Sequence, residues 1–397
     1  MSDLTLAIRL RGVSKRFPGS AEDAVSDLDL DVEQGSIVVL IGPSGCGKTT
    51  TLRMINRLIE PTSGTIEIQG QDISGLPTTD LRRGIGYVIQ QVGLFPHRTI
   101  EANIATVPRT LGWDKARIRA RVEELVDVVG IDRDMLPRYP DELSGGQQQR
   151  VGVARALAAD PPVLLMDEPF GAVDPIVRAR LQDELLLLQS QVHKTIVLVT
   201  HDLDEAVKIA DKIVLLNVGG VVEQYASPDD LLREPATDFV AAFVGEDRSM
   251  RRLSLGTVAD LPFHRGPVVD LDASPAEARS AMEDEGSEWV GLTDGDHFLG
   301  WIDGTEVVDG RDLGDLNRFL PAAQVGPDSS LRNAMEVILN SRTTVAVIDD
   351  DGTFGGVVTL ERIRRALSAS PSPSSGGNGA AAGAAATGRA APAEQGS

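Results

Sequence analysis

Short apolar runs separated by polar segments are the clearest pattern in this chain. Residues 36–41, 163–166 and 195–200 are mostly apolar, and they end against a glycine, an acidic pair and a histidine. Such runs are typical of strands that are buried on both faces of a sheet. Residues 50–58 follow the first run and favour a helix. The pattern predicts an α/β fold with an open sheet.

A helical period dominates the segment that follows. Between residues 115 and 129, apolar side chains recur on one helical face. These side chains are Ile118, Val122, Leu125 and Val129. We expect a helical subdomain over about residues 91–160, and a further helix that begins near Gln148. Residues 143–147, Leu-Ser-Gly-Gly-Gln, come just before that helix.

An internal repeat occupies residues 253–367. Each copy has an amphipathic helix, at residues 277–282 and 330–335. Each then has an acidic turn followed by a strand, at residues 298–302 and 354–358. The order of elements predicts two small α+β units of the same fold.

The two segments that flank the repeat differ in composition. Residues 246–252 are charged and are expected to be a connector. Residues 368–397 consist mainly of Ser, Pro, Gly and Ala, with almost no large apolar side chain. Such a segment buries too little surface to order itself, so we expect a disordered tail.

Charge and hydropathy exclude two classes of protein. The net charge is −21 and the sequence pI is about 4.6, which argues against nucleic acid as a partner because phosphate backbones bind basic surfaces. No stretch approaches the ~18–20 apolar residues of a membrane span, and the N-terminus has no signal segment. We therefore expect a cytoplasmic chain. Cys46 is the single cysteine, which excludes an intrachain disulfide.

Residues 42–49 read Gly-Pro-Ser-Gly-Cys-Gly-Lys-Thr, a complete phosphate-binding loop placed between a predicted strand and a predicted helix. Its backbone N–H groups and the helix N-terminus can face a triphosphate. Lys48 can neutralise phosphate charge, and the Thr49 hydroxyl can bind Mg²⁺. The residues expected to contact ATP here are Gly42, Pro43, Ser44, Gly45, Cys46, Gly47, Lys48, Thr49 and Thr50.

Three further segments point to ATP hydrolysis. Asp167 ends a predicted strand and can hold Mg²⁺, while the adjacent Glu168 can act as general base on the attacking water. His201 follows another strand, at the sheet edge where the γ-phosphate is expected. The loop at residues 143–147 offers a second set of phosphate donors, which makes sense if it serves a nucleotide held by another copy of the chain.

Taken in order, these motifs resemble the nucleotide-binding subunit of ATP-binding-cassette (ABC) transporters over about residues 8–245. The resemblance implies a P-loop ATPase domain of the ABC type over residues 1–245, which works as a head-to-tail homodimer. It implies that Gln90 contacts Mg²⁺ and the attacking water, and that Phe17 stacks on adenine. A place for Phe17 in the core is the alternative.

The resemblance assigns roles to residues as follows. The catalytic set is Lys48, Gln90, Glu168 and His201, and the Mg²⁺ set is Thr49, Gln90 and Asp167. The residues that contact the ATP of the partner copy are Ser144, Gly145, Gly146, Gln147 and Asp174.

The repeat resembles a tandem CBS pair, with halves at about residues 253–309 and 319–367. Many such pairs bind adenine nucleotides, which makes a regulatory nucleotide one expectation and a purely structural dimerisation module the other. The second half has Arg362 where the family pattern has a ribose-binding Asp. Arg362 suits a phosphate.

A cassette followed by a CBS pair resembles the ATPase subunit of bacterial glycine betaine, proline and choline importers. Residues 86–97 and 170–178 also resemble that subfamily. The resemblance implies two membrane permease subunits, a solute-binding protein, and a place on the inner face of the cell membrane. The alternatives are an ABC importer ATPase for another small solute, a non-transport ABC ATPase and a binding-only regulator. The last would have a vestigial ATPase, and the intact catalytic set argues against it: Lys48, Asp167, Glu168 and His201.

Overall fold

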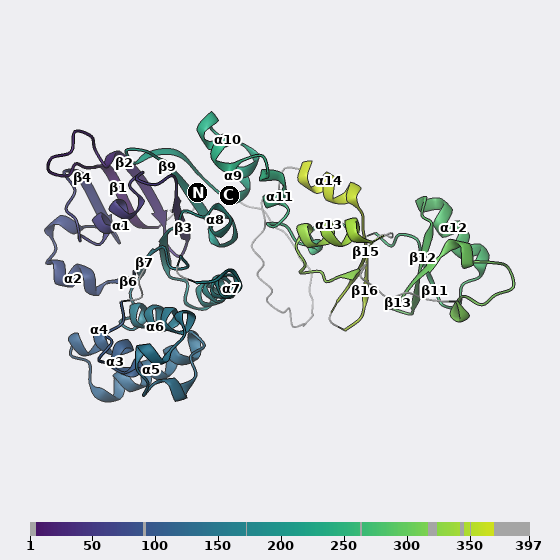
Figure 1. Cartoon of the computed structure of the whole chain (residues 1–397), viewed down its shortest axis with the longest axis horizontal. Helices are drawn as coiled ribbons and strands as arrows, with labels where there is room; N and C mark the ends of the chain where they lie inside the picture. The colour runs from purple at the N-terminus through teal and green to yellow at the C-terminus, as the bar shows by residue number, and fades with distance from the viewer. Residues whose placement is uncertain are drawn as a thin grey trace, which may run out of the picture.

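A computed structural model describes residues 5–89, 93–171, 173–262, 264–316, 324–341, 345–349 and 351–368 (Figure 1). The described residues between 5 and 245 form an N-terminal domain at one end of an elongated molecule. A smaller C-terminal module lies at the other end. Apart from Ser368, the expected tail lies outside the described residues.

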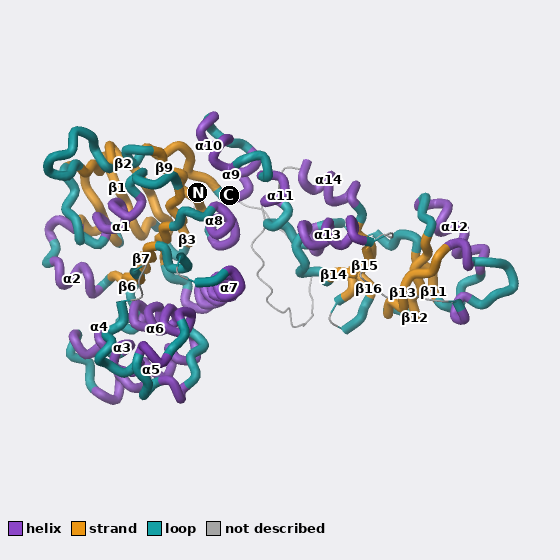
Figure 2. The backbone as a smooth tube through the Cα atoms, in the orientation of Figure 1, coloured by secondary structure: helices purple, strands orange, loops and turns teal. Residues whose placement is uncertain are grey.

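A six-stranded sheet runs through the N-terminal domain, in the order β10-β9-β3-β8-β7-β6 (Figure 2). The strands from β9 to β6 are parallel, and β10 runs antiparallel at the edge. Its strands are β3 (Ile37–Ile41), β6 (Ile85–Val88), β7 (Val163–Asp167), β8 (Thr195–Val199), β9 (Lys212–Asn217) and β10 (Val221–Ala226). The three strands predicted from the apolar runs are thus present, and every residue of β3, β7 and β8 is buried.

Alternate residues of these strands enter two different cores because side chains alternate across a strand. Val38 and Leu40 pack on the side of a second, antiparallel sheet and helix α1. Val39 and Ile41 pack on the side of helices α6 (Gly145–Leu157), α7 and α8. The antiparallel sheet has the order β2-β1-β4-β5. The elements are β1 (Leu6–Lys15), β2 (Val25–Glu33), β4 (Ser63–Ile68), β5 (Gln71–Asp72), α1 (Lys48–Ile55), α7 (Pro175–Val192) and α8 (Leu203–Ile209).

A helical subdomain covers the other end of the sheet and lies below it in Figure 1. Its helices are α3 (Ile100–Ile104), α4 (Thr106–Thr110), α5 (Lys115–Val128) and α6 (Gly145–Leu157), and α2 (Thr78–Arg83) precedes β6. The helical face expected in α5 is buried as predicted. The helix expected near Gln148 begins at Gly145 instead. Ser144 and Gln147 explain the earlier start, since their side chains each accept a hydrogen bond from the other's backbone N–H in a capping box.

The C-terminal module contains the predicted repeat. Each half has one strand, one helix and two more strands. In each sheet the second strand is central, and it pairs parallel with the first strand and antiparallel with the third. The first half is β11 (Val268–Asp270), α12 (Pro275–Glu285), β12 (Trp289–Asp294) and β13 (His297–Asp303). The second half is β14 (Gln324–Val325), α13 (Leu331–Asn340), β15 (Val345–Ile348), β16 (Phe354–Val358) and α14 (Leu360–Ser368).

The boundary expected for the first half needs a correction. Leu253, Val258 and Leu261 are buried in the core of the second half, around α13 and α14, rather than with α12. These side chains share one core with α13, α14 and the strand residues Val345 and Val347. The N-terminal domain ends with α9 (Pro228–Arg233) and α10 (Asp238–Val244), which pack against its core, and α11 (Arg248–Arg252) lies between them and this segment.

Candidate nucleotide site

The phosphate-binding loop joins β3 to α1, and two of its glycines are sterically required. A Cβ on Gly42 would lie 2.1 Å from the Leu216 carbonyl oxygen, and one on Gly47 would lie 2.6 Å from the Ala24 carbonyl oxygen. Both glycines also have positive φ, 147° and 96°. At Gly42 and Gly47 the backbone of the loop therefore lies so close to its neighbours that only glycine fits.

A hollow of about 470 Å³ opens over this loop. It is lined by Ala24, Ser44, Gly45, Cys46, Gly47, Lys48, Thr49, Thr50, Glu168 and His201. The residues predicted from three separate motifs thus border one space. Ala24, which precedes β2, was not identified from the sequence because its small apolar side chain carries no chemical signal.

Lys48 is 8% exposed and its ammonium group lies over the loop. Its Nζ donates to the carbonyl oxygens of Gly42, at 2.8 Å, and Pro43, at 3.0 Å. Cys46 is fully buried beneath the same loop, with Sγ 3.6 Å from Nζ. The loop carbonyls hold a positive charge at the edge of the hollow, which is the charge that a phosphate requires.

Thr49 and Asp167 provide oxygen ligands that fit Mg²⁺. The Thr49 hydroxyl donates to Asp167 Oδ1 at 3.0 Å, which brings the start of α1 against the end of β7. Asp167 is 7% exposed. Burial raises the pKa of its carboxyl, the Glu168 carboxylate raises this pKa further, and the Thr49 hydrogen bond acts in the opposite direction. A buried carboxylate beside a hydroxyl is a suitable site for a hard cation.

Glu168 and His201 come from the ends of neighbouring strands and meet at the hollow. His201 Nδ1 lies 3.3 Å from Glu168 Oε1. Glu168 has φ of 45°, a left-handed conformation that is uncommon for a residue with a side chain. Its backbone N–H donates to the Val199 carbonyl oxygen at 2.9 Å. The turn is thus held by the sheet and directs the carboxylate over the loop.

A polar network next to His201 was missed from the sequence. Thr200 donates its hydroxyl to Glu205 Oε2 at 2.6 Å, and Arg178 lies 3.5 Å from Glu205 Oε1. Burial raises the pKa of the Glu205 carboxyl, while the Thr200 hydrogen bond lowers it. Asp202 caps α8 and accepts from the N–H groups of Asp204 and Glu205. The sequence does contain a signal for this helix start, because Asp202 is a typical capping residue and is followed by the acidic residue Glu205.

Ser144 and Asp174 are both helix caps on one side of the molecule. Ser144 caps α6, and Asp174 caps α7 by accepting from the N–H groups of Ile176 and Val177. A Cβ on Gly146 would lie 3.1 Å from Val177 Cγ1, so the two helix starts are close together. Neither residue lines the hollow over the phosphate loop of its own chain.

Two further predicted residues have different outcomes. Phe17 is 39% exposed, which rules out a place in the core, and Lys15 Nζ lies 5.4 Å from its ring centroid. Its role in stacking stays a prediction. Gln90 lies outside the described residues.

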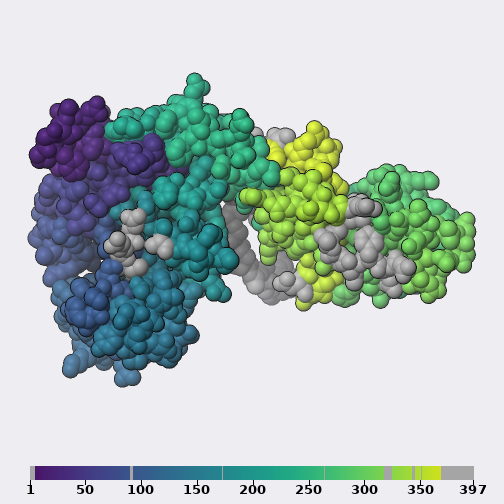
Figure 3. Space-filling view, viewed as in Figure 1, coloured from purple at the N-terminus to yellow at the C-terminus, as the bar shows by residue number. Residues whose placement is uncertain are grey.

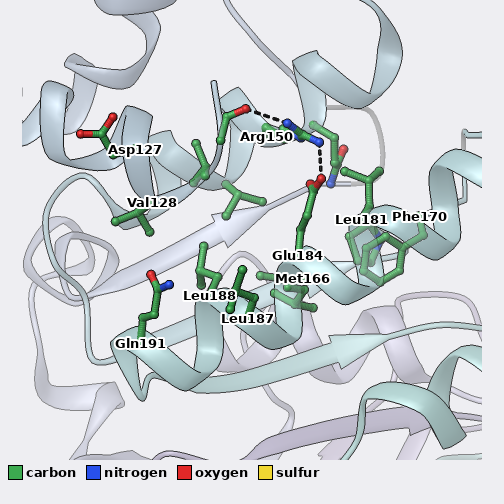
Figure 4. A pocket seen from close by; sticks show the side chains of 16 residues that line it. Asp127, Val128, Arg150, Met166, Phe170, Leu181, Glu184, Leu187, Leu188 and Gln191 are labelled. Carbon is green, nitrogen blue, oxygen red and sulfur yellow. Dashed lines mark hydrogen bonds and ion pairs between the residues drawn. The ribbon is translucent and has the colours of Figure 1, made fainter. Parts of the chain in front are cut away.

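An apolar hollow of about 210 Å³ separates the helical subdomain from the sheet (Figure 4). Val128 of α5, Met166 of β7 and Leu188 of α7 point into it. Arg150 of α6 connects the helical subdomain to α7. It donates to the Gly130 carbonyl oxygen at 2.7 Å and pairs with Glu184 of α7. At this place α6 and α7 are less densely packed against each other than in a filled core.

In the described part of the chain, no helix is both long and apolar enough to span a membrane.

Comparison with known proteins gives consistent matches. The ABC transporter family pattern matches residues 25–171, and the CBS domain pattern matches residues 315–369. The chain is 46% identical to the osmoprotectant import ATP-binding protein OsmV of Salmonella typhimurium, covering 91% of this chain and 96% of that one. It is 45% identical to the glycine betaine/carnitine/choline transport ATP-binding protein OpuCA of Bacillus subtilis, covering 89% and 94%. The solved dimeric ABC transporter cassette MJ0796 is 33% identical, with a TM-score of 0.51, and covers 56% of this chain and 98% of that one.

Proposed function

Since this chain belongs to the family of ABC transporter ATP-binding proteins, we propose that it hydrolyses ATP to drive import of a compatible solute through a membrane permease. The observation that carries the proposal is the single hollow bordered by the phosphate loop, Glu168 and His201. Relatives named for osmoprotectant import and for glycine betaine, carnitine and choline transport support a quaternary amine as cargo.

In this proposal the chain's own residues position ATP and activate water. The loop N–H groups and Lys48 bind the β- and γ-phosphates. Glu168 accepts a proton from the water that attacks the γ-phosphorus, and His201 orients the γ-phosphate. Thr49 and Asp167, with Gln90, would hold Mg²⁺, which when bound supplies positive charge that stabilises the transferred phosphoryl group.

Two copies would complete the sites. Ser144, Gly146 and Gln147 of one copy would contact the ATP bound by Lys48 of the other, with Asp174 at the same interface. Support comes from the position of the Ser144 and Asp174 caps, which lie close together and away from the hollow of their own chain. The dimeric state of the similar MJ0796 cassette gives further support.

The assembly would lie on the inner face of the membrane, with two permease subunits and a solute-binding protein. One surface of the helical subdomain suits contact with a permease, because Phe95 and Tyr139 are exposed aromatic side chains there, at 37% and 45%. A shallow hollow beside Tyr139 is lined by Pro96 and Pro137. The C-terminal module would regulate transport, either by binding a nucleotide or by responding to salt.

Arg362 is a poorer phosphate ligand than its sequence position predicts. Its Nη1 donates to the Pro262 carbonyl oxygen, so part of the guanidinium is already bound to the backbone. A nucleotide at the module would have to displace this bond or use the remaining N–H groups.

The direct test is ATP-dependent uptake of labelled glycine betaine, choline and proline into vesicles that contain the reconstituted transporter. Uptake of at least one solute, lost in the Lys48→Ala variant, is the expected result. A complex that hydrolyses ATP but takes up none of these solutes would overturn the proposed cargo and leave the ATPase assignment standing.

A further inference from the structure

The segment that connects the N-terminal domain to the C-terminal module packs against both of them. Met250 and Leu253 pack into the core of the C-terminal module. Leu255, two residues later, packs against the core of the N-terminal domain. In Figure 3 the green end of the N-terminal domain touches the yellow-green part of the module at this point. Helix α11 is therefore held from both sides, and a shift of the module must move it.

Arg252 makes polar contacts from α11 with both the N-terminal domain and the C-terminal module. Its Nε lies 2.8 Å from Asp229 Oδ1 on α9, and its Nη1 donates to the Leu367 carbonyl oxygen of α14 at 3.0 Å. The Leu253 carbonyl oxygen accepts from the Arg332 N–H of α13 at 3.0 Å. The last turn of α11 thus has its position set by α13 and α14.

Arg251, the neighbouring residue, reaches the catalytic side. Its Nε lies 2.6 Å from Asp204 Oδ1, and its Nη1 donates to the Val244 carbonyl oxygen at 2.8 Å. Asp204 is in the first turn of α8, three residues after His201. One ion pair therefore joins the helix that the module holds to the turn that carries the histidine.

The same turn is held from the opposite direction by Arg178 of α7. Arg178 Nη1 lies 3.4 Å from Asp202 Oδ2, and its Nη2 donates to the Val173 carbonyl oxygen, next to Asp174, at 3.4 Å. Its Nε also lies 3.5 Å from Glu205 Oε1. The first turn of α8 is thus bound by one arginine from the expected dimer interface and by another from the connector.

We propose that Arg251 is a positioning residue for His201, through which the C-terminal module controls the rate of ATP hydrolysis. When the module moves, α11 moves with it, and the Arg251–Asp204 pair transfers the shift to the first turn of α8 and so to His201. The inference rests on the proposed role of His201 at the γ-phosphate.

The strength of the pair sets the size of the effect. Asp204 is 71% exposed and Arg251 25% exposed, so the pair is partly solvated and resembles a surface ion pair. Such pairs change equilibria by about two- to fivefold. Arg251 would therefore adjust turnover rather than switch it on and off, and added salt would weaken the coupling.

The test compares kcat and KM for Mg-ATP in the full-length chain. Arg251→Gln and Asp204→Asn are each expected to lower kcat about two- to fivefold, with KM changed less than about twofold. The double variant should be no worse than either single one, because both remove the same pair. Arg251→Lys should retain most of the activity. Arg248→Gln, an exposed position on the same helix, is the matched control and should match the wild-type chain.

The same Arg251 substitution in a His201→Ala chain tests whether Arg251 acts through His201. In a His201→Ala chain, Arg251→Gln should not lower the residual turnover further, whereas a general loss of folding would lower it again. Wild-type kcat in both Arg251→Gln and Asp204→Asn, or additive losses in the double variant, would overturn the inference. Wild-type turnover in His201→Ala alone would instead overturn the proposed role of His201.

Discussion

Glu168 Oε1 and His201 Nδ1 lie 3.3 Å apart, although 33 positions separate the two residues in the sequence. The parallel strands β7 and β8 make this contact possible because they are adjacent in the sheet and their carboxyl ends meet at one edge. Both side chains border the hollow over the phosphate loop. The sheet thus gives the proposed general base and the histidine a shared position over the phosphate loop.

Replacing Glu168 by Gln should lower ATP turnover by roughly 10²-fold or more, because the change removes the general base and keeps the size of the side chain. ATP binding should persist, so the variant should form a stable dimer with ATP on gel filtration. The control is Glu22→Gln, at an exposed position. Near-normal hydrolysis by Glu168→Gln would exclude Glu168 as the base.

The role of the Thr49 hydroxyl can be tested by itself, because a Thr49→Ser substitution keeps the hydroxyl and a Thr49→Ala substitution removes it. Thr49→Ala removes the donor to Asp167 and one proposed Mg²⁺ ligand, so half-maximal ATPase activity should need roughly fivefold or more Mg²⁺. Thr49→Ser should stay close to the wild-type chain. A magnesium titration of ATPase activity measures both. Equal curves for the Ala and Ser variants would contradict the role of the hydroxyl.

Sharing of one ATP between two chains can be tested with mixed dimers. In the proposed arrangement, Ser144→Arg should block the site of the partner copy, whereas Lys48→Ala should damage the site of its own copy. A mixture of the two variants should therefore contain dimers with one doubly damaged site and one intact site. ATP binding should appear in the mixture and be absent from each homodimer. No gain in the mixture would contradict the head-to-tail arrangement.

The sequence predicted the buried strands and the phosphate loop more completely than the ion pairs that connect distant elements. The strands β3, β7 and β8 were evident because a strand buried on both faces must be apolar throughout. The loop residues of the hollow were evident because phosphate binding requires glycines and a lysine at fixed spacing, whereas Ala24 was not. The Arg178 and Arg251 contacts with the first turn of α8 were not predictable, because ion pairs between residues far apart in the sequence leave no periodic signal. The placement of Leu253 in the second half of the module depended on tertiary packing that local sequence does not encode.

Glu205 should make stability depend on pH. Burial raises its pKa from an ordinary value of 4.5. The folded chain then binds this proton more tightly than the unfolded chain, so the free energy of unfolding falls as pH rises from about 4.5 through the raised pKa. Glu205→Gln removes this dependence and keeps an acceptor for the Thr200 hydroxyl.

The measurement for Glu205 is the denaturant midpoint of both chains between pH 4.5 and 8. The midpoint of Glu205→Gln should rise relative to that of the wild-type chain as pH increases over this window. The control is Glu60→Gln, a side chain that is 64% exposed. Parallel curves for the wild-type and Glu205→Gln chains would show that Glu205 has no raised pKa.

Removal of the C-terminal module should separate catalysis from regulation. Residues 246–368 carry 23 acidic and 12 basic side chains with no lysine, so anionic lipid head groups would repel the module. Salt screens this repulsion over ~8–10 Å at physiological ionic strength, which would let the module change its position as the cell loses water. A chain that ends at Gly256 keeps α11, Arg251 and Leu255, and its ATPase activity should survive because every nucleotide-site residue precedes Gly245.

The decisive measurement is solute uptake by the full-length and shortened chains, in vesicles of matched lipid charge, over a range of salt concentrations. The full-length transporter should respond to salt and the shortened one should not, since the shortened chain has lost the charged body that moves α11. A response that also requires an added nucleotide would assign the module to ligand binding instead. If both chains respond alike, the module serves only to hold the chain together or to dimerise it, and the sensor must lie in the permease.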